Sequence, residues 1–311
     1  MAAFPDPAAA PFRPRHAAAL AVAKFRDPLR TARGEERARV ELRALRTLWF
    51  NTGTLCNLAC ANCYIGSTPT NDALLYLSAA EVRTFLDEIA RDRLPVEEIG
   101  FTGGEPFMNP EIAAMLGDAL ERGHRVLVLS NAMRPMRRHE RALREMAAHH
   151  GDRLRVRVSL DHHDAAAHEA ERGAGSWELV LDGLRWLHGN GVSLAIAGRQ
   201  LPGEPLDAAR EGYAALLRRL GVPLDVGDPE RLVLFPEMDA TVDVPEISAS
   251  CWDLLGKRPD SVMCASSRMV VRRRGEAAAR VAACTLLPFE REFDMGGTLR
   301  EAARTVRLNH P

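Results

Sequence analysis

The feature that most constrains the fold is a regular alternation of strand-like and helix-like segments through the middle of the chain. Short runs of mostly apolar residues are separated by longer stretches in which apolar residues recur at helical spacing. Strands that alternate with helices favour βα units and a parallel sheet. The sequence therefore predicts an α/β fold, a partial (β/α)6 barrel rather than a closed eightfold one. The predicted strands are 47–52, 97–102, 125–130, 155–160, 192–197 and 231–235.

Helix boundaries between these strands carry capping signals. Ser78 followed by Glu81 is typical of a capping box, and Asn109 before Pro110 predicts a second helix start. Ser176 predicts a third.

Polar and reactive residues gather at one end of the predicted strands. The carboxyl ends of parallel strands meet at one edge of a sheet, and binding sites form there. A cysteine loop over 56–63, the run 103–105, the pair 130–131, Ser159 and Asp161 all fall at this edge. We therefore expect them to form one site.

Three of the six cysteines, Cys56, Cys60 and Cys63, lie within eight residues. Three thiolates on a short loop can ligate three irons of a [4Fe–4S] cluster and leave the fourth iron open to another ligand. A structural zinc site would need a fourth cysteine or histidine nearby, and residues 40–75 contain none besides these three. The cysteines could also be buried without a ligand, or belong to a disulfide framework of the kind typical of small secreted domains.

The run 56–63, followed by the aromatic Tyr64, resembles the CxxxCxxC signature of the radical S-adenosylmethionine (SAM) superfamily. The run 100–106, Gly-Phe-Thr-Gly-Gly-Glu-Pro, resembles that family's GGEP motif. The resemblance implies that the amino and carboxylate groups of SAM chelate the open iron, and that reductive cleavage gives a 5′-deoxyadenosyl radical, which abstracts hydrogen from a substrate. It also implies a flavodoxin or ferredoxin as electron donor. Tyr64 would lie near the adenine, with ordinary packing as the alternative.

The same resemblance implies further SAM-binding residues. Gly103 and Gly104 would let the backbone approach the ligand closely, with a plain strand-to-helix turn as the alternative. Glu105 would accept hydrogen bonds from the SAM ammonium. Ser130 and Asn131 would contact the ribose, with a turn or a helix cap as the alternative.

A second stretch, 158–161 with 171–177, resembles the "SxD … RGxGSF" pattern of the radical SAM subgroup with SPASM or twitch extensions. By this resemblance Ser159 and Arg172 would bind the SAM carboxylate, which a guanidinium can contact through two hydrogen bonds. A surface ion pair is the alternative for Arg172. Asp161 would be a catalytic residue that handles a substrate proton, and an aspartate that starts a turn is the alternative.

The three remaining cysteines lie in the tail, 236–311, which is expected to form a small α+β domain. Cys264 and Cys284 flank a predicted hairpin, so their thiols could meet at its base. Together with Cys251 they resemble the ligands of a twitch-type auxiliary [4Fe–4S] cluster, although the further cysteines of that pattern are missing after Cys284. Unliganded cysteines or zinc are the alternatives. The predicted hairpin strands are 268–273 and 280–284.

Residues 1–46 are expected to form an N-terminal extension with a loose start and a basic amphipathic helix over 35–46, either a solvated cap or a docking arm. Residues 47–235 would be the radical SAM core.

The formal net charge of −1 provides no basic field for nucleic acid. No run approaches the roughly 18–20 apolar residues of a membrane span, and no secretion signal is expected, so the prediction is a cytoplasmic protein. The histidine pairs 149–150 and 162–163 are expected to be solvated.

The sequence thus predicts a radical SAM enzyme acting on a peptide or a small molecule, the peptide being favoured by the twitch resemblance. The alternative from another class is a non-catalytic iron–sulfur protein, an electron carrier or sensor. Such a protein would need no SAM-binding residues, so the run 103–105, Ser159 and Arg172 argue against it.

Overall fold

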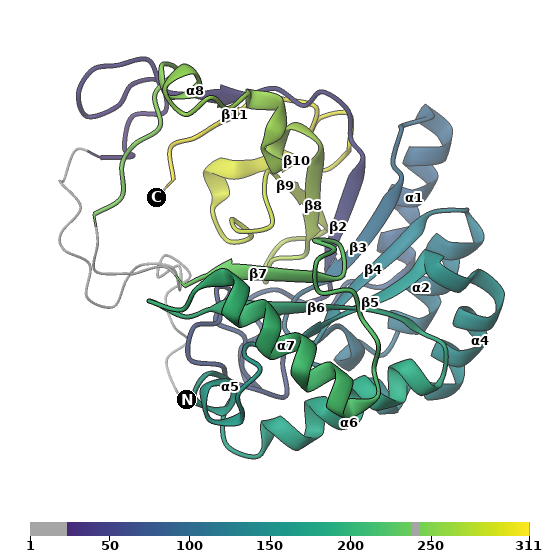
Figure 1. Ribbon diagram of the computed structural model, residues 1–311. Helices are drawn as coiled ribbons and strands as arrows, with labels where there is room; N and C mark the ends of the chain where they lie inside the picture. Colours follow the sequence, from purple (N-terminus) through teal and green to yellow (C-terminus); the bar gives the residue numbers. More distant parts are fainter. Residues whose placement is uncertain (1–23, 238–242, 311) are drawn as a thin grey trace.

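A nine-stranded sheet forms the centre of the computed structural model, which describes residues 24–237 and 243–310 (Figure 1). Six neighbouring strands run parallel in chain order, as predicted. In the described part of the chain the two edge strands, β10 and β7, do not pair with each other, so the barrel is open. The six strands are β2 (Thr47–Asn51), β3 (Glu98–Thr102), β4 (Arg125–Ser130), β5 (Leu154–Ser159), β6 (Ser193–Gln200) and β7 (Leu232–Pro236).

Helices connect these strands and cover the outside of the sheet (Figure 1). The Ser78–Glu81 capping box is confirmed at the first helix, whereas the second begins at Ile112, after a 3-10 turn, rather than at Pro110. Within the described ranges no helix combines the length and the apolar character needed to cross a bilayer. The helices are α1 (Ala79–Asp92), α2 (Ile112–Glu121), α3 (Arg134–Arg137), α4 (Glu140–His150), α5 (Ala165–Arg172), α6 (Ser176–Gly189), α7 (Leu206–Leu220) and α8 (Cys251–Leu254).

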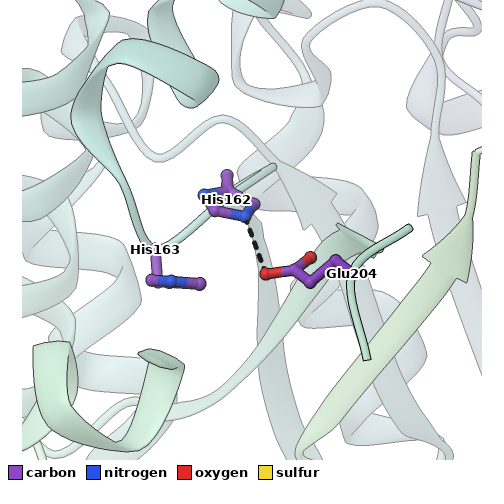
Figure 2. Close-up of side chains that lie close together, drawn as sticks. All are labelled: His162, His163 and Glu204. Atoms are coloured by element: carbon purple, nitrogen blue, oxygen red, sulfur yellow. Dashed lines mark hydrogen bonds and ion pairs between the residues drawn. The ribbon is translucent and has the colours of Figure 1, made fainter. Parts of the chain in front are cut away.

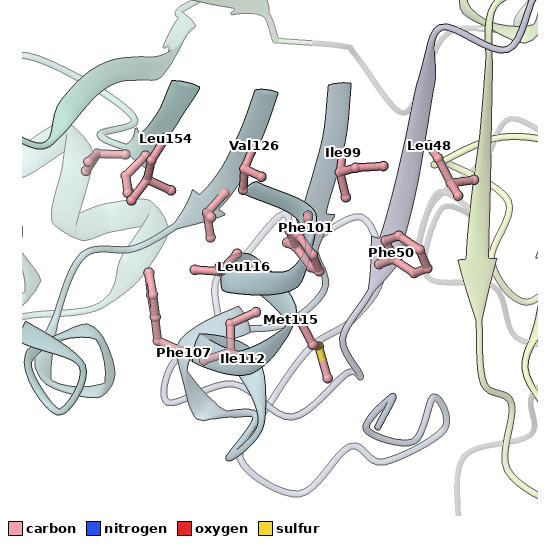
Figure 3. Packing of buried hydrophobic residues seen from close by; sticks show 14 of the residues in the cluster. Leu48, Phe50, Ile99, Phe101, Phe107, Ile112, Met115, Leu116, Val126 and Leu154 are labelled. Atoms are coloured by element: carbon pink, nitrogen blue, oxygen red, sulfur yellow. The ribbon is translucent and has the colours of Figure 1, made fainter. Parts of the chain in front are cut away.

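The hydrophobic core has two layers because successive side chains of a strand face opposite sides. Leu48 and Phe50 of β2 belong to the larger cluster, which packs the sheet against the helices and is shown in part in Figure 3. Trp49, between them, belongs to a smaller cluster with Leu127 of β4 and Met269 of the tail. Each fully buried large apolar side chain contributes roughly 1.5–3 kcal/mol to this packing.

The tail adds its strands to the same sheet. β8 (Ser267–Val271) pairs in parallel with β2, and β9 (Arg280–Ala282) returns antiparallel to β8, which confirms the predicted hairpin. β10 (Asp294–Gly296) pairs antiparallel with β9. The tail therefore extends the barrel sheet beyond β2, and the boundary at residue 236 stays a prediction.

The helix predicted over 35–46 is wrong. This segment contains β1 (Arg39–Val40), which pairs antiparallel with β11 (Val306–Arg307). Ala38 and Val40 are fully buried and the residue between them is exposed, an alternation typical of a strand rather than a helix. The first part of that extension lies outside the described residues.

Candidate functional site

The three-cysteine loop follows β2 at the carboxyl edge of the sheet, as predicted. Cys56 is buried, and Cys60 and Cys63 are half-buried. Backbone N–H groups of Leu58 and Ser67 lie 3.4 Å from the Cys56 sulfur and 3.3 Å from the Cys63 sulfur. Such donors stabilise anionic sulfur, so this set of donors fits thiolate ligation of a cluster.

Side chains supply further donors to the same sulfurs. Asn131 Nδ2 lies 3.9 Å from Cys56 Sγ, and Arg172 Nη1 lies 3.8 Å from Cys60 Sγ. Burial raises the pKa of Cys56 to about 12 and also raises the pKa of Cys60. Both groups are therefore thiols at neutral pH, and binding of a metal would displace their protons.

The cysteine sulfurs do not have the spacing of ligands on one zinc ion. Thiolates on one tetrahedral zinc lie about 3.8 Å apart, because each Zn–S bond is about 2.3 Å long. In the described part of the chain no three cysteine sulfurs lie within 4.8 Å of one another, in the loop or in the tail. A cubane holds its thiolates on separate corner irons and tolerates the wider spacing.

The glycines after β3 pack directly on this loop. Gly103 has a φ of +136°, and a Cβ there would lie 2.5 Å from the Gly53 carbonyl oxygen. A Cβ on Gly104 would lie 2.3 Å from the Leu55 carbonyl oxygen. The Gly104 N–H donates to Gly53 O at 2.8 Å, and the Glu105 N–H donates to Leu55 O at 3.1 Å. Glycine is thus required here so that two backbone segments can touch beside the cysteines.

Glu105 is the most deeply buried acid of the site, at 1% exposure. Its Oε1 accepts hydrogen bonds from Phe107 N–H at 3.1 Å and Ser130 Oγ at 2.9 Å, and its Oε2 accepts one from Asn131 N–H at 2.8 Å. Burial raises the pKa of Glu105 to about 7, although these hydrogen bonds lower it. Ser130 and Asn131 therefore orient Glu105. Asn131 also donates its side-chain amide to Asn57 at 2.9 Å, a cysteine-loop contact that the sequence did not indicate.

The structure pairs two residues that were expected to act separately. Arg172 Nε and Nη2 donate to the two carboxylate oxygens of Asp161 at 2.6 and 3.3 Å. Arg172 is thus held by an acid, and only Nη1 faces the cysteine loop. Ser159, half-buried at the end of β5, makes no side-chain hydrogen bond to either of them.

Tyr64 and two tail cysteines lie near one another. Burial raises the pKa of Tyr64 to about 12, with contributions from the charges of Cys63 and Cys284. Cys264 and Cys284 share a hydrogen bond, which raises the pKa of Cys264 and lowers that of Cys284. Their thiols therefore meet at the base of the hairpin as predicted. Cys251 is half-buried in α8, where its sulfur lies 3.5 Å from Ser248 Oγ.

His162 and His163 differ from the expectation of a solvated pair, since His162 is only 7% exposed. Figure 2 shows His162, His163 and Glu204 together, and the His162 Nε2 to Glu204 Oε1 distance is 3.2 Å. The Asp164 N–H donates to His162 Nδ1 at 3.0 Å, so the neutral ring carries its proton on Nε2. A metal would need a lone pair on that nitrogen, and we interpret the contact as a hydrogen bond.

Comparison with known proteins identifies the family to which this chain belongs. The family model described as Radical SAM superfamily matches residues 50–216, more than half of the chain. The AdoMet-dependent heme synthase of Nitratidesulfovibrio vulgaris is 27% identical over 150 residues, which cover 45% of this chain and 36% of the relative. The mycofactocin maturase MftC of Mycobacterium tuberculosis is 28% identical over 176 residues, covering 55% and 41%. The chain thus spans about two fifths of the length of these curated relatives.

Solved structures agree on the fold. Streptococcus suis SuiB bound to S-adenosylmethionine superposes with a TM-score of 0.55 at 11% identity, and SuiB bound to precursor peptide SuiA with 0.54 at 14%. Each covers 82% of this chain and 63% of SuiB. The matched range 50–216 contains the cysteine loop, the turn formed by Gly103 and Gly104 (the glycine turn) and Arg172. This chain belongs to the radical SAM superfamily and is a radical SAM enzyme.

Proposed function

We propose that this enzyme cleaves SAM reductively at a [4Fe–4S] cluster held by Cys56, Cys60 and Cys63, and that it removes a hydrogen atom from a peptide. The observation that carries the proposal is the loop in which every one of these sulfurs faces an N–H donor. When bound and reduced, the cluster supplies the electron that splits SAM into methionine and a 5′-deoxyadenosyl radical.

The glycine turn and Glu105 would hold the amino end of SAM. An ionised carboxylate offers about four acceptor positions, and three of those on Glu105 are occupied. The remaining position would accept a hydrogen bond from the SAM ammonium, beside the half-buried backbone of Gly103 and Gly104. Ser130 and Asn131 would orient Glu105 and contact the ribose.

The SAM carboxylate is assigned to Ser159 and Arg172, and the adenine to Tyr64. Asp161 occupies two N–H groups of the Arg172 guanidinium, so the remaining amino group, Nη1, would bind the carboxylate beside Cys60. Because Asp161 uses both of its oxygens in this pair, the contact favours an orienting role over the expected transfer of a substrate proton.

A peptide substrate is supported by the maturase MftC and by SuiB, whose structure includes a precursor peptide. A second candidate is a small molecule, which the heme synthase favours. Both come from proteins longer than the span matched in this chain.

The tail would be twitch-like and hold an auxiliary [4Fe–4S] cluster through Cys251, Cys264 and Cys284. The contact between the last two thiols supports this proposal. A flavodoxin or ferredoxin would donate the electrons.

We place the protein in the cytoplasm, a reducing compartment in which free cysteines persist. Nucleic acid and membrane are not expected as partners.

The test measures iron and sulfide per chain after anaerobic reconstitution and dithionite-driven formation of 5′-deoxyadenosine on the same sample. We expect about eight irons with SAM cleavage for two clusters. About four irons with cleavage would remove the auxiliary cluster. A cluster without SAM cleavage would favour the non-catalytic electron carrier or sensor.

A further inference from the structure

Glu171, in the last turn of α5, is a buried carboxylate that the proposed reaction does not use. Its exposure is 8%. Oε1 accepts a hydrogen bond from the Asn62 backbone N–H at 2.7 Å, and Oε2 accepts one from the Asn62 side-chain amide at 2.9 Å. The Glu171 carbonyl accepts the Ala61 N–H at 2.9 Å. One residue of α5 thus binds both residues that separate Cys60 from Cys63.

An arginine fixes the same carboxylate from the opposite side. Arg199 of β6 donates Nη1 to Glu171 Oε2 at 2.6 Å and Nη2 to Glu237 Oε1 at 2.5 Å. The Arg199 backbone N–H donates to the Asp161 carbonyl at 2.8 Å. The Glu171 carboxylate is therefore held in one orientation by the carboxyl edge of the sheet.

We propose that Glu171 is a positioning residue, whose carboxylate holds the Cys60–Cys63 segment in the conformation that receives the cluster and SAM. This inference rests on the proposed function. Glu171 contacts the segment between the two cysteines through Ala61 and Asn62 and takes no part in the chemistry.

The physical reason is that this segment has little else to order it. Ala61 and Asn62 are exposed residues, and the backbone hydrogen bond that crosses the segment, from Cys63 N–H to Cys60 O, is 3.4 Å long. Fixing a backbone residue costs conformational entropy of about 1–2 kcal/mol. Hydrogen bonds to a buried carboxylate are among the stronger ones in proteins, so they offset this cost before the cluster binds.

The test compares Glu171→Gln and Glu171→Ala with Glu169→Gln. Glu169 lies on the same helix, but its carboxylate binds the N–H groups of Gly175 and Trp177 instead of the cysteine loop. The first measurement is hydrogen exchange of residues 57–66 in iron-free protein. The second is the SAM concentration that half-converts the EPR spectrum of the reduced cluster.

We expect exchange of the Asn62 amide to rise about tenfold or more in both Glu171 variants, and Glu169→Gln to match wild type. We expect Glu171→Gln to retain its iron and to need about tenfold more SAM for half-conversion. Retained iron with an unchanged SAM requirement overturns the inference, with or without faster exchange. If folded Glu171→Gln loses its iron and its Asn62 amide exchanges faster, the result supports the inference. If it loses its iron while Asn62 exchange is unchanged, the inference is overturned. Wild-type protein that binds no iron or cleaves no SAM overturns the proposed function instead.

Discussion

Replacing Glu105 by Gln should change how the stability of the iron-free protein depends on pH. Burial raises the pKa of Glu105 from 4.5 to about 7 in the folded chain. A raised pKa contributes stability that is present below pH 4.5 and is lost as the pH rises through about 7. The difference corresponds to roughly 3 kcal/mol of unfolding free energy. Glu105→Gln carries no titrating group, so its stability relative to wild type should rise by that amount across this window.

The comparison must be a difference between the two proteins, because another buried group titrates with the opposite slope. Burial lowers the pKa of His168 from 6.5 to about 4, so its contribution to stability is lost as the pH falls through that range. His168 is present in both proteins and cancels. In Glu105→Gln the side-chain amide lies beside the Asn131 N–H, which donates a hydrogen bond to Glu105 in wild type. This change shifts the difference in unfolding free energy by a constant amount and does not make it depend on pH.

The assay is urea unfolding of both iron-free proteins under anaerobic, reducing conditions between pH 4.5 and 8. A difference in unfolding free energy that stays flat within about 1 kcal/mol would contradict the raised pKa of Glu105. It would mean that the three hydrogen bonds keep Glu105 ionised despite its burial.

Three further substitutions test the rest of the site, and a fourth, at Gly117 of α2, is a control. Cys60→Ala should abolish the first cluster and 5′-deoxyadenosine formation, and retained turnover would contradict the ligand assignment. Gly104→Ala places a Cβ 2.3 Å from the Leu55 carbonyl oxygen and should cost about 1–3 kcal/mol in chemical denaturation. Gly117→Ala, whose Cβ meets nothing closer than 3.9 Å inside α2, should be neutral or stabilising by up to about 1 kcal/mol. Cys264→Ala should lower the iron content and leave SAM cleavage partly intact, whereas an unchanged iron count would remove the auxiliary site.

The barrel strands could be predicted because each is a local pattern of apolar residues bounded by polar turns. The pairing of β8 with β2 could not, because nothing local in a strand specifies a partner more than 200 residues away. In the segment 35–46 a local pattern predicted the wrong type of element. Its basic residues suggested a helix, while the alternate burial of Ala38 and Val40 follows from pairing with a strand near the other end of the described chain.

In the candidate site, too, the sequence indicates the residues of local motifs but not the contacts between distant segments. Cys56 and Glu105 could be proposed from the sequence because they follow strands and belong to recognisable motifs. The pairing of Asp161 with Arg172, and the contact of Glu171 with Asn62, join residues from different segments without any periodic signal. These two contacts, an ion pair and a hydrogen bond, depend on how α5 packs on the cysteine loop, which sequence spacing does not reveal.

Arg268 is a buried cation of the tail that lies near Cys264 and Cys284 and that the sequence did not indicate. It is 1% exposed, and its guanidinium donates to backbone carbonyls such as those of Ala302 and Cys264, with no carboxylate paired to it in the described part of the chain. A buried guanidinium stays charged and is costly without an anion nearby. Burial lowers the pKa of Arg268, and the two tail cysteines raise it. Cys264 and Cys284 thus lie where negative charge on their sulfurs would offset this buried guanidinium, which supports the auxiliary cluster that we propose for the tail.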